Sequence, residues 1–253
     1  SWQESATLSC NNPESNPVAT VITPRERDIG EFTVRRALPA ASCRSVGPFV
    51  FFDQMGPVVL EKDQAMDVRP HPHIGLSTIT WLFEGEIHHR DSLGMDLVIR
   101  PGEVNWMTAG KGIVHSERSP DSARQVAAPL SGIQAWMALP ADQEEIEPAF
   151  YHYSSDKIPR LNLPGIQLAL IAGAAWGLES AVQTQSPTFY AELRMQTAAC
   201  LEVPADIPER AIYICSGSIT IAELGYAAGC MVVLKPGMAV TLQAESDCLC
   251  MLL

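Results

Sequence analysis

Short apolar segments separated by glycine and proline turns run along this chain. In its first half the apolar, β-rich segments are residues 49–52, 76–83, 97–99 and 133–139, and the turns between them include Gly47-Pro48, Gly56-Pro57 and Pro101-Gly102. Short runs rich in β-branched and aromatic residues, bounded by Gly and Pro, are typical of β-strands. Segments with helical periodicity are scarce. The pattern therefore predicts an all-β sandwich or barrel.

The second half repeats this pattern, with expected strands at residues 188–193, 211–215, 218–222, 231–234 and 239–242. Residues 81–85 resemble 213–217, and residues 97–102 resemble 232–237, where an apolar strand ends in a basic residue, Pro and Gly. Self-similarity of this kind indicates an internal duplication.

Three prolines between positions 140 and 160 mark the expected boundary between the two halves. We therefore assign residues 21–145 to an N-terminal domain and residues 146–253 to a C-terminal domain. Residues 1–20 are polar and lack the apolar core of a signal peptide, so we expect them to form a flexible leader.

Composition narrows the function classes. The chain has 253 residues, 47% of them hydrophobic, which suits a well-buried globular protein. It carries a net charge of −12 and no apolar run long enough to cross a bilayer, so we expect neither direct nucleic-acid binding nor membrane binding. The seven cysteines show no CxxC spacing, which predicts reduced thiols and a cytoplasmic location.

Two short histidine motifs carry the candidate chemistry. His71 and His73 are two residues apart, as are His115 and Glu117. Residues two apart in a β-strand point to the same face, so two such pairs on facing strands could converge inside a barrel. Imidazole and carboxylate are suitable ligands for a divalent first-row metal. We predict that these four residues bind one metal and leave up to two octahedral positions open, as catalysis requires.

The polar residues in and near these motifs have alternative roles. Glu117 could instead hydrogen-bond a ligand or face solvent. We expect His88 and His89 to point to opposite faces of a strand in structural roles, with His89 pairing with Asp91. His152 is expected at the surface or between the domains. It is the last histidine of the chain, so the second domain is predicted to have lost the metal site.

Two further features flank the motifs. Asp53 and Gln54 follow an apolar segment and could reach the mouth of the pocket, but we favour the interpretation that they end a strand. Gly110 and Gly112 are expected to allow a tight turn before His115, because glycine adopts positive φ without steric cost.

Several of these segments together resemble the pirin family of the cupin superfamily, most strongly over residues 24–140. The matching segments are residues 25–28, 46–53, 70–73, 85–94 and 106–117. The resemblance implies a bicupin, in which two antiparallel β-barrels pack together and the N-terminal one holds the metal. It implies His71, His73, His115 and Glu117 as ligands, usually of iron. Ser77-Thr78 stands where a cupin usually places a metal-binding glutamate, so Glu117 would supply the carboxylate.

The same resemblance implies a function. Bacterial relatives are described as quercetin 2,3-dioxygenases, so we expect a small aromatic or enol substrate, O2 as co-substrate and Glu117 as the group that accepts the substrate's proton. We choose Fe(II) as the metal, although these ligands also suit Mn, Ni, Co, Cu or Zn. The alternative is a non-enzymatic, iron-dependent redox-sensing regulator that binds a partner protein, as a mammalian relative is described. We expect a monomer because the two barrels already pair.

Overall fold

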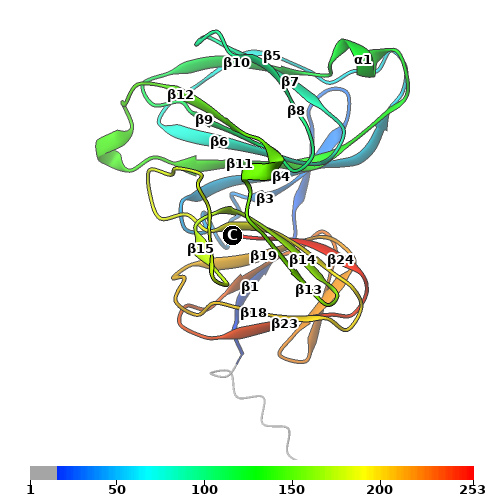
Figure 1. Cartoon of the computed structure of the whole chain (residues 1–253), viewed down its shortest axis with the longest axis vertical. Helices are drawn as coiled ribbons and strands as arrows, with labels where there is room; N and C mark the ends of the chain where they lie inside the picture. Colours follow the sequence, from blue (N-terminus) through cyan, green and yellow to red (C-terminus); the bar gives the residue numbers. More distant parts are fainter. Residues whose placement is uncertain (1–15) are drawn as a thin grey trace, which may run out of the picture.

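Two antiparallel β-barrels make up the part of the chain that the structure describes, which is residues 16–253 of a computed structural model (Figure 1). Each barrel pairs a seven-stranded sheet with a four-stranded sheet. The short α1 (Asp121–Arg124) and two single-turn 3-10 helices, Ala141–Gln143 and Ser155–Lys157, lie in the connections. The all-β fold predicted from the turn pattern is confirmed.

The first barrel holds most of the N-terminal half. Its larger sheet has the order β12 (Ala149–Tyr153), β9 (Val104–Thr108), β6 (Leu76–Glu84), β11 (Ala128–Ala138), β4 (Phe49–Leu60), β3 (Thr33–Leu38) and β2 (Arg25–Asp28). Its smaller sheet has the order β5 (Asp67–His73), β10 (Ile113–Arg118), β7 (Ile87–Asp91) and β8 (Asp96–Ile99).

The second barrel has the same plan. Its larger sheet has the order β1 (Val18–Ile22), β22 (Met231–Leu234), β19 (Arg210–Ser216), β24 (Cys248–Leu252), β17 (Tyr190–Met195), β14 (Ile166–Ala172) and β13 (Arg160–Leu163). Its smaller sheet has the order β18 (Cys200–Val203), β23 (Val240–Ala244), β20 (Ser218–Ile221) and β21 (Leu224–Ala227). The two-residue strands β15 (Ala174–Ala175) and β16 (Leu178–Glu179) form a small hairpin.

The two larger sheets pack against each other through one continuous hydrophobic core. The ring of Phe52 packs against Tyr213 with centroids 4.9 Å apart, and Phe49 packs against Tyr190 at 5.1 Å. Strands β4, β6 and β11 are therefore buried on both faces, since one face meets the other barrel and the opposite face lines their own barrel. This double burial explains their nearly continuous apolar sequences.

Two hydrogen bonds cross the apolar seam between the barrels. The indole N–H of Trp81 donates to the carboxylate of Glu192 at 2.8 Å, and the hydroxyl of Tyr213 donates to the side-chain carbonyl of Gln54. All four side chains are buried. Buried polar groups are costly unless they are paired, so these contacts also fix how the two sheets align.

The domain boundaries predicted from the sequence need correction. Residues 1–15 lie outside the described part of the chain, but Val18–Ile22 is a strand of the second barrel that pairs with β22, so a leader extending through residue 20 is wrong for residues 18–20. The boundary at 145/146 falls too early, because β12 pairs with β9 of the first barrel. Backbone hydrogen bonding to a sheet edge, which the local sequence does not reveal, decides both cases.

The two barrels share one strand order, as the internal duplication predicts, but one of the two proposed sequence matches joins strands that are not equivalent. Strands β6 and β19 occupy equivalent third positions in the larger sheets, which agrees with matching residues 81–85 to 213–217. Residues 97–99 lie in β8, at the edge of a smaller sheet, whereas Met231–Leu234 is equivalent to β9 in a larger sheet. The shared basic-Pro-Gly ending reflects similar turn chemistry rather than an equivalent position.

Two further observations concern the rest of the chain. The six cysteines in the described residues are all free thiols, while Cys10 lies outside them. None of the helices in the described part has the length and apolar composition needed to cross a lipid bilayer.

The seam hydrogen bond of Tyr213 gives a stability prediction. Tyr213→Phe removes the hydroxyl that donates to the buried side-chain carbonyl of Gln54, so we expect the free energy of unfolding to fall by about 1–3 kcal/mol. Urea denaturation followed by fluorescence measures this change. The matched variant Tyr226→Phe, at a half-buried residue of the outer hairpin, should shift stability by less than about 0.5 kcal/mol. Equal effects of both variants would contradict the assigned role of the seam bond.

Candidate metal centre

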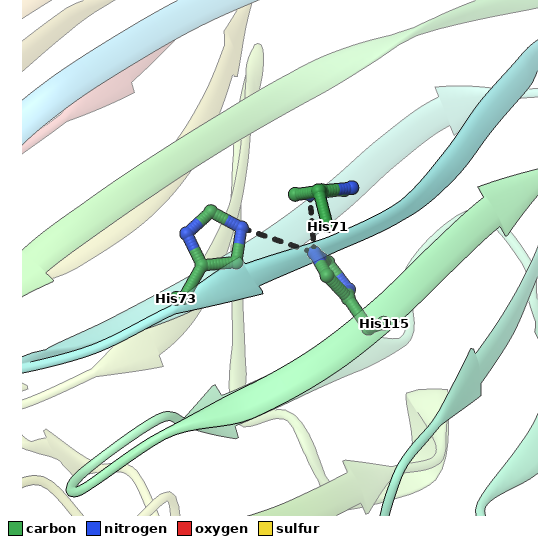
Figure 2. Close-up of side chains that lie close together, drawn as sticks. All are labelled: His71, His73 and His115. Atoms are coloured by element: carbon green, nitrogen blue, oxygen red, sulfur yellow. Dashed lines mark hydrogen bonds between the residues drawn. The ribbon is translucent and has the colours of Figure 1, made fainter.

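Three histidines meet on two adjacent strands of the first barrel's smaller sheet. Strand β5 carries His71 and His73, and its antiparallel neighbour β10 carries His115 directly opposite His71. One ring nitrogen from each histidine lies within 4.8 Å of the other two. Figure 2 shows the three rings turned toward one another from these two strands. The convergence expected from the spacing of the residues is confirmed for the three histidines.

The geometry at the centre of the cluster is that of ligands rather than of a hydrogen-bonded network. The Nε2 atom of His115 lies 2.9 Å from Nε2 of His71 and 3.1 Å from Nε2 of His73. A neutral imidazole nitrogen carries either a proton or a lone pair, so the Nε2 atom of His115 can donate to one neighbour or accept from one, but not satisfy both. If the three Nε2 atoms instead direct their lone pairs at one bound cation, none of them needs to donate a hydrogen bond to another.

The spacing also fits a metal ion. Nitrogens bound at about 2.1 Å and at right angles around one ion lie about 3 Å apart, close to both observed separations. The Nδ1–H of His71 donates to the backbone carbonyl of Arg69 at 2.7 Å, which leaves its Nε2 free to bind. The residues present therefore fit a mononuclear site held by three Nε2 atoms.

Burial keeps the imidazoles of His73 and His115 neutral. It lowers the pKa of His73 to about 4, with a smaller contribution from the neighbouring His71. Burial likewise lowers the pKa of His115 to about 2, and the adjacent histidines add to the effect. A neutral imidazole offers the lone pair that a metal needs, so both residues are ready to bind at neutral pH.

Glu117 lies in the same cavity but outside the tight cluster. Among the described residues, the group whose ligand atoms all lie within 4.8 Å of one another contains the three histidines alone. One extra residue of β5 bulges between the two paired positions, so Glu117 pairs with Val68 while His115 pairs with His71. Burial raises the pKa of Glu117 to about 7, and a hydrogen bond with Thr80 partly opposes the shift. Its role as a fourth ligand therefore stays a prediction.

A cavity of about 350 Å³ opens onto the histidines. Phe51 and Trp136 form one wall, with their rings stacked at 3.9 Å and 13°, and the edge of Trp136 faces the ring of His73. Glu117 and Gln134 are the polar groups of the wall nearest to Thr80, whose hydroxyl donates to the side-chain carbonyl of Gln134 at 2.8 Å. The cavity thus combines an aromatic wall with a few polar groups.

The prediction that Asp53 ends a strand is wrong. Strand β4 continues to Leu60, and Asp53 lies in its middle, where its carboxylate lines the cavity. The guanidinium of Arg36 donates to both carboxylate oxygens, at 2.8 and 3.0 Å. Burial nevertheless raises the pKa of Asp53, because the loss of water outweighs the effect of Arg36.

The sequence carries a signal for these cavity residues in the alternation along two strands. Phe51 and Asp53 are two residues apart on β4, and Gln134 and Trp136 are two apart on β11, so each pair shares one face of its strand. Polar residues inside otherwise apolar strands mark a lined cavity. Gln54 points the other way, to the seam and Tyr213.

The other histidines have the structural roles expected for them. The Nε2 of His89 lies 2.8 Å from the carboxylate of Asp91, and its ring stacks on Phe150 beside the cluster. His88 on the opposite face of β7 pairs with Asp96. His152 is exposed, and its Nδ1 makes a 2.7 Å hydrogen bond with Asn105.

The turn before His115 also forms as predicted. Gly110 has φ +53° and Gly112 has φ +145°. A side chain at position 110 would collide with the backbone carbonyl of Ile146, because an added Cβ would lie 2.0 Å from its oxygen. Glycine is therefore required there for space as well as for conformation.

Two barrels packed by their larger sheets, with a histidine cluster inside one of them, define a bicupin of the cupin superfamily. The family model described as Pirin matches residues 31–137. The Pirin-like protein of Caulobacter vibrioides is 45% identical over 236 residues, which cover 92% of this chain and 82% of that protein. Pirin of Homo sapiens is 32% identical over 212 residues, which cover 82% of this chain and 69% of that protein. The chain belongs to the pirin family.

One solved structure is similar to this chain in both fold and sequence. The crystal structure of quercetin 2,3-dioxygenase from Acinetobacter baumannii superposes with a TM-score of 0.85 at 32% identity. The match covers 92% of this chain and 77% of that one. The bicupin fold is thus supported along nearly the whole described chain, including the second barrel.

The cluster gives a prediction about metal content. Protein loaded anaerobically with Fe(II) should bind one ion per chain, and His73→Ala or His115→Ala should lose most of it, because each removes one of three converging nitrogens. Elemental analysis after gel filtration measures the content. His88→Ala and His152→Ala are matched controls that should keep the metal, since their rings face away from the cluster. Full metal content in the His115 variant would contradict the site.

Proposed function

We propose that this protein is a metal-dependent dioxygenase that opens a flavonol ring, in the manner named for quercetin 2,3-dioxygenase. The observation that carries the proposal is the convergence of three imidazoles beside an aromatic-walled cavity. The structural match to a protein that bears this name, at 32% identity, supports the same assignment. The proposed metal is Fe(II), held by His71, His73 and His115 with Glu117 as fourth ligand.

The metal would supply Lewis-acid stabilisation of the substrate oxyanion and a place for O2 to react. The chain's own residues would bind the substrate and accept its proton. Glu117 is the carboxylate of the cavity that shares a strand with His115, and we propose it as the group that accepts the proton of the substrate hydroxyl. Thr80 is hydrogen-bonded to Gln134 and also interacts with the Glu117 carboxylate, so it helps to orient that carboxylate, and its single hydroxyl proton serves one of the two partners at a time.

The cavity walls favour a flat aromatic substrate. Phe51 and Trp136 present stacked rings, and Val34 and Met55 add apolar surface. A volume of about 350 Å³ lies within the range of small-molecule sites. A planar flavonol would bury its rings against this wall and direct its hydroxyl groups toward the histidines. Exclusion of water by the apolar wall would also protect the electron-rich ring until O2 arrives.

Oxygen uptake tests the proposal. Fe(II)-loaded protein should consume O2 with quercetin, and Glu117→Gln should lower kcat by about 100-fold or more, because an amide cannot accept the substrate proton. An oxygen electrode measures the rate, and metal analysis shows that the variant is loaded. Glu144→Gln, at an exposed position, is the matched control and should keep full activity.

Two outcomes would redirect this assignment. Full turnover by the Glu117 variant would remove it as the proton acceptor. No oxygen uptake by wild-type protein with one iron per chain would overturn the enzymatic function, and would favour the non-enzymatic, redox-sensing role. In that case the next measurement is capture of protein partners by the Fe(II), Fe(III) and apo forms.

The aromatic wall gives a separate kinetic prediction. Trp136→Leu removes the indole that stacks on Phe51, so we expect the KM for quercetin to rise about 2- to 10-fold, as the loss of one aromatic pair implies. Steady-state kinetics should show a smaller effect on kcat, and metal content should remain that of the wild type. A loss of kcat at unchanged KM would contradict a substrate-stacking role.

A further inference from the structure

A second cavity, of about 530 Å³, lies at the seam between the barrels. Its walls come from both: residues 46–49 belong to the first barrel, and residues 173–189 and 206–209 supply most of the lining from the second. None of its lining residues also lines the cavity at the histidines. The proposed dioxygenase chemistry therefore makes no use of it.

The floor of this seam cavity is apolar and rigid. Phe49, Phe189, Val182 and Leu253 line it, and all four are buried. The ring of Phe49 is held against Tyr190 across the seam. Such a floor can bury the hydrocarbon or aromatic part of a ligand, and a site of this size where two domains meet is a usual place for one.

The rim of the seam cavity carries only negative charge. Glu179, Asp206 and Glu209 are its charged residues, all three are exposed, and no Lys, Arg or His is among the lining residues. None of the three has an ion-pair partner among the described residues.

The cation that interacts with Asp206 makes its hydrogen bonds elsewhere. Arg210 interacts electrostatically with Asp206, but its guanidinium donates to the backbone carbonyls of Pro204, Lys235 and Met238. Its side chain is therefore fixed beneath the loop rather than free to neutralise the rim. The rim thus keeps a net negative charge above an apolar floor.

We propose that the seam cavity binds a small organic ammonium ion with an apolar or aromatic body. The body would pack on Phe49 and Phe189, and the ammonium group would lie between the rim carboxylates. The aromatic faces add a cation–π attraction that a neutral ligand lacks. Anionic molecules, including an ionised flavonol, are repelled by the same rim. This proposal does not depend on the chemistry at the histidines.

Charge selectivity is the first test. The probes are 3-phenylpropylamine, its neutral counterpart 3-phenylpropan-1-ol and the anion 3-phenylpropanoate, each titrated into the full-length protein by calorimetry. The amine should bind about tenfold more tightly than the alcohol, since each exposed carboxylate contributes a small attraction and the three act together on the ammonium group. The anion should bind most weakly. Equal affinities for amine and alcohol would overturn the proposal.

Variants then locate the site. Glu179→Gln, Asp206→Asn and Glu209→Gln combined should reduce the affinity for the amine to that for the alcohol. The matched control combines Glu61→Gln, Glu144→Gln and Glu223→Gln, three exposed carboxylates elsewhere that change the net charge equally. An unchanged affinity for the amine in the rim variant, or an equal loss in the control, would overturn the assignment.

A filling variant separates the two cavities. Ala174→Phe places a large side chain at an exposed lining position of the seam cavity and should weaken both the amine and the alcohol at least about fivefold. His73→Ala, which acts on the metal centre, should leave both affinities unchanged. Loss of amine binding in the His73 variant would place the ligand at the histidines and overturn the seam site.

Discussion

The face-to-face packing of the two seven-stranded sheets is the constraint on which the rest of the molecule depends. It buries the central residues of strands β4, β6 and β11 on both sides, so most residues along these strands face either the other barrel or the interior of their own. Because successive side chains of a strand point to opposite faces of the sheet, neighbouring residues make contacts on different sides. Trp81 bonds to Glu192 across the seam, while its neighbour Thr80 interacts with the polar wall of the metal cavity.

The metal centre depends on this packing indirectly. The histidines themselves lie on the smaller sheet, where the antiparallel register of β5 and β10 sets His71 opposite His115. The larger sheet supplies the wall that faces them, with Trp136 against the ring of His73. A side chain that is held by packing on both faces of its sheet loses little further entropy on binding a ligand, which favours a preorganised site.

The second barrel keeps the plan of the first without a histidine cluster in its described residues. Its edge strand β1 occupies the place that β12 occupies in the first barrel. The other strands of the second barrel follow the first barrel in sequence, whereas β1 precedes it. The pairing of β1 with β22 joins the N-terminal part of the described chain to the second barrel through backbone hydrogen bonds. The barrels are therefore linked by chain topology as well as by their shared apolar seam, and the seam leaves a cavity with its own chemistry.

The sequence by itself determined the all-β class, the duplication and the three histidines, because strand periodicity and turn residues are local properties. The two-residue spacing of His71 and His73 was enough to predict a shared face, and Gly110 was recognisable as a turn residue. The tertiary structure alone decided that Val18–Ile22 joins the distant β22, that Asp53 lines a cavity beside Arg36, and that residues 97–99 are not equivalent to β22. Each of these depends on which strands become neighbours, and pairing between segments far apart in sequence is set by the packing of the whole chain. The bulge in β5 that sets Glu117 opposite Val68 was also decided by the tertiary structure, since it becomes defined only when β5 and β10 pair.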